Sequence, residues 1–237
     1  MGLLGAVYGG LGVALAGQSA LNTVWAVPRN DRPNPIKARG RALLLLGTVG
    51  TGVVLTTGLS AVSGGAGALG SWVRVVTLTA AAVVTNIGAF VVGFRLATTR
   101  ALSVRDVLPG AVSAAVAWQL LQLGGKAYVT RTIQHASASN SLFALVLGLI
   151  AFLYVTSLIV VLSAEANAVR VGRLWPRTLL TPLTDDVALT PADERAYTEQ
   201  ALAQWTKGFE RIEVTFDKDA DRTGEDVDRT DEDPAAR

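Results

Sequence analysis

An uncharged apolar stretch from Ser141 to Ala164 constrains the fold more than any other feature of the chain. A helix needs about 20 predominantly apolar residues to cross the roughly 30 Å of hydrocarbon in a bilayer, and this stretch meets that requirement. Four stretches of similar character precede it. Together the five predict membrane-spanning helices over residues 2–27, 42–62, 73–94, 107–128 and 141–164.

A water-soluble fold is the alternative to a membrane protein. A soluble domain can bury one such run as a core helix, but five runs in succession would need an unusually dry core. Charged residues make up 17% of the chain, against about 25% in typical soluble proteins. The sequence therefore predicts an all-α fold, with a polytopic transmembrane helix bundle over residues 1–176.

Basic residues are concentrated in alternate connections between the predicted spans. The first connection, Pro28 to Arg41, carries five bases against one acid, and the third carries three bases against one acid. The second has no charge, and the fourth has only Arg131 and His135. Basic connections lie in the cytoplasm, which predicts a multi-pass plasma-membrane protein with a cytoplasmic C-terminus. Because this orientation puts Gly2 outside without a basic n-region, we expect one spanning helix to be missing from the front of the chain.

The residues after the last predicted span differ in composition. Thr190 and Pro191 are typical of a helix N-cap and first helical position, and acids follow in the next turn. Apolar residues then recur at four-residue spacing. The pattern predicts a short amphipathic helix at about 191–209 within a cytoplasmic segment, 177–216. Residues 217–237 hold nine acids, four bases and no aromatic residue, which predicts a disordered acidic tail.

Two further patterns are typical of membrane helices. Small residues are dense in the first two predicted spans, where we expect them to allow close helix packing; they include Gly5, Gly9, Gly47, Gly50 and Gly52. Aromatic residues lie close to the predicted span ends, as in an aromatic belt; they are Trp25, Trp72, Tyr128 and Trp175.

Polar side chains at membrane depth are the candidate functional residues. Such groups are costly in a bilayer and tend to face a bundle interior or a water-filled cavity. Gln119, Gln122 and Lys126 share one face of the fourth predicted helix. The alternative is that Lys126 snorkels to the outer interface while Glu165 lies at the inner one. The full candidate set for a substrate path is Asn22, Asn86, Gln119, Gln122, Lys126, Glu165 and Asn167.

The residue inventory argues against an enzyme. The chain has no cysteine and one histidine, His135, which excludes a zinc site built from Cys and His ligands. It contains no Walker A loop, no nucleotide-binding glycine fingerprint and no HExxH motif. We therefore expect no catalytic residues, no metal and no cofactor.

Three sequence patterns, in order, resemble motifs of a known membrane family. They are ALN at 20–22 followed by Trp25 and Pro28, DVLPGA at 106–111 followed by Trp118 and Tyr128, and LY at 153–154 leading to SAEAN at 163–167. On these motifs the chain, over about residues 1–173, resembles the YihY/BrkB family, also called virulence factor BrkB. Ser163 stands where that family usually has glycine.

The resemblance implies a six-helix inner-membrane protein with both termini in the cytoplasm, one helix more than the five spans here. Members of the family were formerly labelled ribonuclease BN. The single histidine argues against a metal-dependent nuclease, and we expect no nucleic-acid partner. Envelope integrity and export of lipids or envelope precursors are the functions usually suggested for the family.

Two functions are compatible with these features. The first is transport or flipping of an envelope lipid or amphiphile along the polar helix face. The second is that of a non-transporting envelope-integrity scaffold. Membrane lipids are the expected partners, and a homo-oligomer or a cytoplasmic partner bound through the C-terminal tail both stay open.

Overall fold

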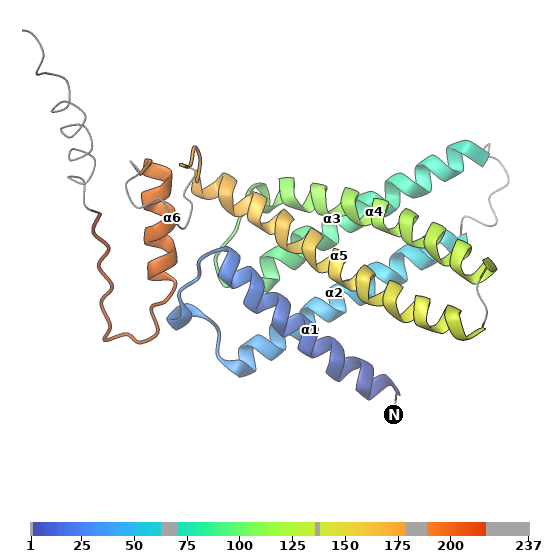
Figure 1. Cartoon of the computed structure of the whole chain (residues 1–237), viewed down its shortest axis with the longest axis horizontal. Helices are drawn as coiled ribbons and strands as arrows, with labels where there is room; N and C mark the ends of the chain where they lie inside the picture. Colours follow the sequence, from blue (N-terminus) through green and yellow to red (C-terminus); the bar gives the residue numbers. More distant parts are fainter. Residues whose placement is uncertain (1, 63–70, 136–137, 179–188, 217–237) are drawn as a thin grey trace, which may run out of the picture. The chain divides into compact units, whose positions relative to one another are not determined.

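The computed structural model describes residues 2–62, 71–135, 138–178 and 189–216, and within these ranges it contains helices and no strand. The elements are α1 (Gly2–Val24), the 3₁₀ turn η1 (Arg29–Asp31), α2 (Pro35–Val62), α3 (Ser71–Ala97), α4 (Val104–His135), α5 (Ala138–Gly172) and α6 (Pro191–Leu202) (Figure 1). The all-α fold predicted from the sequence is confirmed.

Four of the predicted spans lie within one long helix each, and the first, 2–27, extends three residues beyond the end of α1. Four helices contain segments that are long and apolar enough to cross a membrane: Leu4–Val24 in α1, Val76–Ala97 in α3, Val104–Arg131 in α4 and Leu142–Gly172 in α5. The second predicted span, 42–62, lies in α2, which has 28 residues and is not among these four over the described residues. The bases Lys37, Arg39 and Arg41, expected in a connecting loop, lie in the first turns of α2. Pro35 begins this helix, at a position where the missing N–H of proline has no intrahelical partner to lose.

The chain divides into two compact units. Unit 1 comprises Met1–Val27 and Arg32–Ala168, and therefore α1 to α4 and most of α5. Unit 2 comprises Pro28–Asp31 and Val169–Arg237, and therefore η1, the end of α5 and α6. Because η1 belongs to unit 2, the connection between α1 and α2 is shared between the units.

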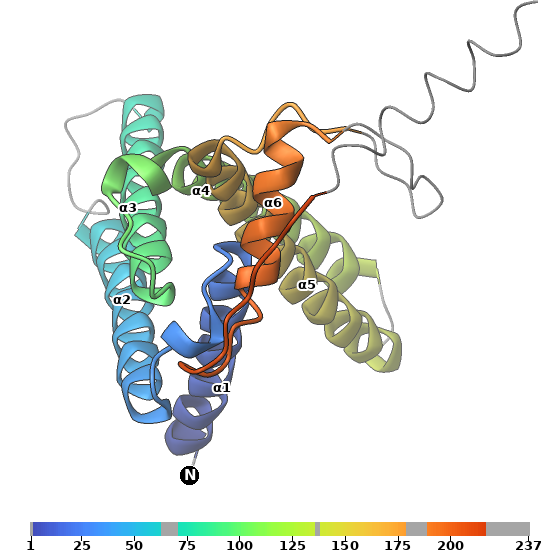
Figure 2. The same cartoon turned by 90° about the vertical axis from the view of Figure 1, so that its left-hand side faces the viewer.

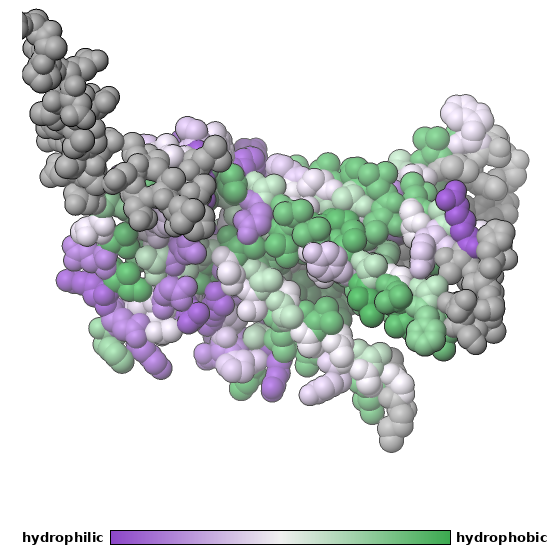
Figure 3. All heavy atoms as spheres, in the orientation of Figure 1, coloured by the Kyte–Doolittle hydropathy of each residue, from purple (hydrophilic) through white to green (hydrophobic). Residues whose placement is uncertain are grey.

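The helices of unit 1 pack largely in sequence order. Helix α1 packs on α2 and α3, α2 packs on α3, and α3 packs on α4 (Figures 1 and 2). Hydrogen bonds and an aromatic contact join α4 to α5. Hydrophobic side chains cover much of the long helices (Figure 3), and many are exposed, including Tyr8, Val13, Phe143 and Leu147. This exposure fits helices whose outer faces contact hydrocarbon.

The buried residues of unit 1 gather where α1, α3 and α5 end and where α2 and α4 begin, and we call this region the packed end. Its buried apolar residues include Leu21, Ala42, Phe94, Ala97, Leu102, Val107, Ala111, Ala114, Ala115 and Ala164. Alanine predominates on α4, which lets neighbouring backbones approach closely. Trp25, expected in an aromatic belt, is instead a core residue with 3% of its surface exposed, and the Arg100 guanidinium carbon lies 5.7 Å from its ring.

The glycines predicted to pack closely in α1 and α2 do not do so within the chain. Nothing in a neighbouring element lies within 4 Å of the place that a Cβ would take at Gly5, Gly9, Gly47, Gly50 or Gly52. The glycines in close contact are Gly10, Gly110 and Gly148. Glycine spacing indicates a helix face that a neighbouring helix can approach closely. Whether a neighbouring helix packs on that face depends on the tertiary structure.

In unit 2, α6 begins with the N-cap that the sequence predicted. The Asp193 backbone N–H donates to the Thr190 hydroxyl over 3.2 Å, and the Thr190 backbone N–H donates to the Asp193 carboxylate over 3.1 Å. The carboxylate of Asp193, which is fully buried, also accepts hydrogen bonds from the backbone N–H of Thr178 and from Nε of Arg177, each over 3.0 Å. These donors, led by the Thr178 N–H and the Thr190 hydroxyl, hold the pKa of Asp193 far below its usual range.

Helix α6 ends at Leu202, so the predicted end near residue 209 is wrong. The reason is a local turn that competes with the helix. The carboxylate of Glu210 accepts the backbone N–H groups of Thr206 and Lys207, over 2.9 and 3.0 Å. Hydrogen bonds of this kind offer the backbone an alternative to helical pairing.

The end of α6 is also joined to η1. The backbone N–H of Arg29 donates to the carbonyl of Ala203 over 3.3 Å, and that of Asn30 donates to the carbonyl of Trp205 over 3.0 Å. These bonds satisfy backbone groups beyond the last turn of α6. They tie a segment near residue 30 to one near residue 204, a pairing that has no local sequence signal.

Replacing Asp193 by Asn should loosen α6 at pH 7, because the charged acceptor at its N-cap is lost. Since the folded-state pKa is depressed, the charge stabilises α6 above the unfolded-state pKa of about 4, and this stabilisation is lost as the pH falls below that value. Hydrogen–deuterium exchange should be faster in α6 of Asp193→Asn than in wild type. Glu194→Gln, in the same turn, is the control and should exchange like wild type. Equal exchange in wild type and Asp193→Asn would contradict this role.

Candidate functional site

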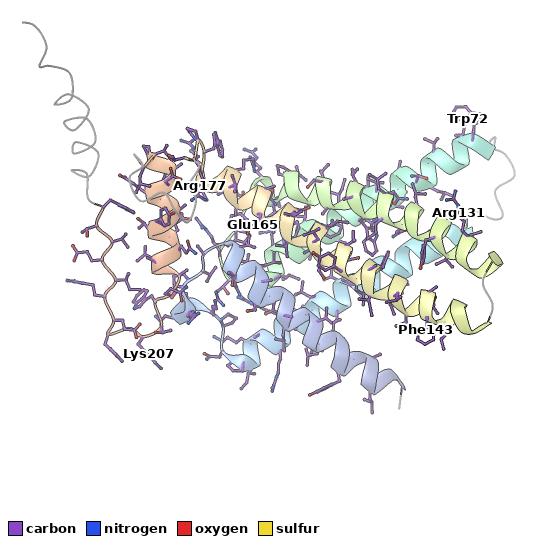
Figure 4. The ribbon with its side chains drawn as sticks, in the orientation of Figure 1. Trp72, Arg131, Phe143, Glu165, Arg177 and Lys207 are labelled. Carbon is purple, nitrogen blue, oxygen red and sulfur yellow. The ribbon has the colours of Figure 1, made fainter. Side chains whose placement is uncertain are left out.

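A groove of about 870 Å³ runs along α4 and α5, away from the packed end. Its walls come from the second half of α4 and the first half of α5. In Figure 4, Arg131 and Phe143 mark this end of the two helices, and Glu165 lies toward the packed end of α5. The volume falls within the range of about 300–1,000 Å³ that is typical of small-molecule sites.

Aromatic side chains hold α4 and α5 together along the groove. The Tyr128 hydroxyl donates to the Ala144 carbonyl over 3.1 Å. The Tyr128 ring lies against Gly148, where a Cβ would come within 2.7 Å of it, so a larger residue would displace the ring. Closer to the packed end, the rings of Trp118 and Phe152 pack edge to face with their centroids 5.7 Å apart.

The two sides of the groove differ in polarity. Helix α4 contributes Gln122, Lys126 and Thr130, whose four-residue spacing places them along one side of the helix. Helix α5 contributes apolar residues, among them Leu149 and Phe152. The groove therefore has a polar stripe on one wall and an apolar surface on the other.

The structure brings two of the seven candidate residues to this groove, Gln122 and Lys126. Gln119 is half-buried on α4 and does not line the groove, and Asn86 is half-buried on α3. Glu165 is exposed on α5. The candidates thus do not form one continuous polar path.

Asn22 lies in the packed end, where it joins α1 to the end of α3. Its side-chain oxygen accepts the backbone N–H of Thr99 over 2.8 Å and the hydroxyl of Thr98 over 3.4 Å. A second amide, Gln18, donates to the Ala38 carbonyl in the first turn of α2 over 3.1 Å. Both side chains are buried. Both side chains therefore have hydrogen-bond partners on the backbone of another segment, as buried polar groups generally do.

Asn167 joins α5 to the first turns of α4. Helix α4 contains Pro109, which has no N–H to donate and disturbs the helical hydrogen bonds around it. The Asn167 amide nitrogen donates to the Val107 carbonyl over 3.0 Å, and its oxygen accepts the Gly110 N–H over 2.8 Å. Asn167 is 1% exposed, so these two bonds join α5 to α4 on either side of Pro109 from within the core.

The contact between α4 and α5 at Asn167 requires a glycine at position 110. A Cβ at this position would overlap the Ser163 carbonyl oxygen and the Asn167 side chain. The contact therefore brings together residues from two of the sequence motifs, the Pro-Gly of α4 and the Asn of α5. It explains physically why those residue types occur together in one chain.

A family model described as Virulence factor BrkB matches residues 1–179. The chain belongs to the virulence factor BrkB family. The match covers α1 to α5 and ends before α6. No curated protein and no solved structure was found to be similar to it. Together with its apolar helices, the family membership makes this BrkB protein a multi-pass membrane protein.

The contact of Tyr128 with Gly148 was not predicted from the sequence. The sequence patterns place Tyr128 at a span end and in a family motif, and they do not single out Gly148. A glycine inside an otherwise bulky apolar run is a weak signal for close approach. Over the described residues, no group of three His, Asp or Glu side chains could hold a metal ion.

Gly110→Ala should destabilise the protein by about 1–3 kcal/mol, because the added methyl group is forced into the α4–α5 contact. Asn167→Ala should cost a similar amount, about 1–3 kcal/mol for each backbone group left buried without a partner. The measurement is thermal unfolding in detergent, followed by circular dichroism.

Gly124→Ala is the matched control for Gly110→Ala. It lies on the same helix, and nothing stands within 4 Å of its Cβ position. Since alanine favours a helix over glycine by about 1 kcal/mol, this variant should be at least as stable as wild type. If Gly110→Ala and Gly124→Ala unfold alike, the close contact at Gly110 is not important for stability.

Proposed function

We propose that this BrkB-family protein moves a lipid or another amphiphile across the plasma membrane along the α4–α5 groove. The groove is the observation that carries the proposal. It combines a length of apolar wall with a few polar side chains, which is the arrangement that an amphiphile needs. Its α5 wall includes the exposed apolar residues Leu145 and Leu147, so a lipid can enter sideways from the bilayer.

The distribution of charge supports one orientation for this activity. The basic residues at the ends and starts of the helices in the packed end include Lys37, Arg39, Arg41, Arg95, Arg100 and Arg105. Positively charged connections favour the cytoplasmic side. The packed end and the C-terminus then lie toward the cytoplasm, and the groove opens in the outer half of the membrane.

The packed end supplies a fixed base for such a groove. Asn22, Gln18 and Asn167 use their hydrogen-bonding groups on backbone atoms of neighbouring helices. In the described part of the groove end, the Tyr128 hydroxyl donates to the Ala144 carbonyl. We propose that α4 and α5 separate there by releasing this exposed bond, while the buried network stays intact. The lipid path would then widen at the groove end and stay closed at the packed end.

Filling the groove should stop lipid movement. Ala151 is exposed and lines the groove, so Ala151→Trp puts a large side chain into it. In proteoliposomes carrying fluorescent phospholipid, the variant should scramble lipid at the protein-free rate while wild type scrambles it faster. Ile150→Trp is the matched control, because Ile150 is the adjacent exposed residue and does not line the groove. Equal rates for wild type and Ala151→Trp would exclude the groove as the path.

A second candidate function is that of an envelope-integrity scaffold. The observation that favours it is the packed end, where buried hydrogen bonds join the helices. A scaffold needs a rigid bundle and no pathway. Wild-type protein that is folded and moves no lipid in the same vesicles would support this function over transport.

A further inference from the structure

The position of Lys126 indicates which amphiphile the groove takes. Lys126 lines the groove together with Gln122 and Thr130, and the α5 wall opposite is apolar. Lys126 is exposed, so its ammonium group can reach a ligand. A cation at membrane depth is expensive unless it pairs with an anion or reaches water.

The chain offers no anion for Lys126 over its described residues. No acidic residue occurs in the sequence between Asp106 and Glu165. Asp106 lies on the same helix as Lys126, about 30 Å away at 1.5 Å per residue. Glu165 lies near the level of Ser113, because Ser113 and Ser163 join α4 to α5 through a hydroxyl contact of 3.3 Å. Ser113 is about 20 Å from Lys126 along α4 at 1.5 Å per residue.

We propose that the groove binds an amphiphile with an anionic headgroup, such as a phosphate, whose charge pairs with Lys126 while its acyl chain lies on the α5 wall. The inference rests on the proposed function and names the substrate class of the same site. Gln122 and Thr130 are hydrogen-bond donors on either side of Lys126, and phosphate oxygens accept such bonds. An acid in the lining would repel this headgroup, and the described lining contains none.

A zwitterionic headgroup fits less well. Its quaternary ammonium would stand beside Lys126 with no carboxylate to neutralise it. The Tyr128 hydroxyl is already used on the Ala144 carbonyl, and a single tyrosine is not the aromatic cage that binds such cations. Lys126 therefore selects for net negative charge.

The absence of cysteine allows a single-thiol test on the full chain. Leu149→Cys places one thiol on the groove wall, and Ile150→Cys places one on an adjacent exposed residue that does not line it. Each is labelled with bimane and reconstituted into vesicles with brominated phosphatidylglycerol or brominated phosphatidylcholine. Quenching of the bimane then measures the relative affinity of the labelled surface for the two lipids.

At Leu149→Cys we expect phosphatidylglycerol to be preferred, by roughly two- to fivefold as for a solvent-accessible ion pair. Lys126→Gln should remove the preference and Lys126→Arg should keep it. Arg131→Gln should also keep it, because Arg131 is an exposed cation near the same end of α4 that does not line the groove. Ile150→Cys should show no preference. Equal affinity for both lipids at Leu149→Cys, or a preference unchanged by Lys126→Gln, would overturn the inference.

The outcome separates this inference from the proposed function. Scrambling of both lipids at equal rates, with no preference at Leu149→Cys, leaves transport in place and rejects the anionic headgroup site. A preference for phosphatidylglycerol that depends on Lys126, in protein that scrambles neither lipid, supports the site and contradicts transport.

Discussion

The buried amide of Asn167 is the interaction on which the rest of unit 1 depends. It donates to Val107 and accepts from Gly110, on both sides of Pro109. Proline removes one helical hydrogen bond from this part of α4. The two bonds from Asn167 join α5 to the α4 backbone on either side of Pro109, and they fix the register of α5 against α4. That register is what places Tyr128 over Gly148 farther along the same pair of helices.

Polar side chains in this protein serve two different purposes according to where they lie. In the packed end the amides of Gln18, Asn22 and Asn167 are buried and form hydrogen bonds with backbone atoms of neighbouring segments. Along the groove the polar side chains are exposed or half-buried and lie on one helix only. The first arrangement stabilises a fixed contact, whereas the second leaves hydrogen-bonding capacity for a ligand.

Unit 2 is stabilised by a different kind of interaction. Asp193 is a buried charge that accepts hydrogen bonds from backbone and side-chain donors on two segments, before and at the start of α6. A buried carboxylate is tolerated only when its acceptor sites are filled. The family match ends before α6, so this capped helix lies outside the part of the chain that the family defines.

The sequence alone determined the helical class, the membrane location of the spans and the N-cap of α6, because apolar run length and capping residues act locally. It also identified Asn22, Gln122, Lys126 and Asn167 as polar groups at membrane depth, without their roles. Only the tertiary structure decided that Asn22 and Asn167 bind backbone atoms of other helices and that Gln122 and Lys126 face a groove. It also decided that Gly110 and Gly148 are in close contact, whereas Gly5 and Gly9 of α1 are not. The physical reason is that a polar or small residue permits several neighbours, and the neighbour is chosen by residues distant in sequence.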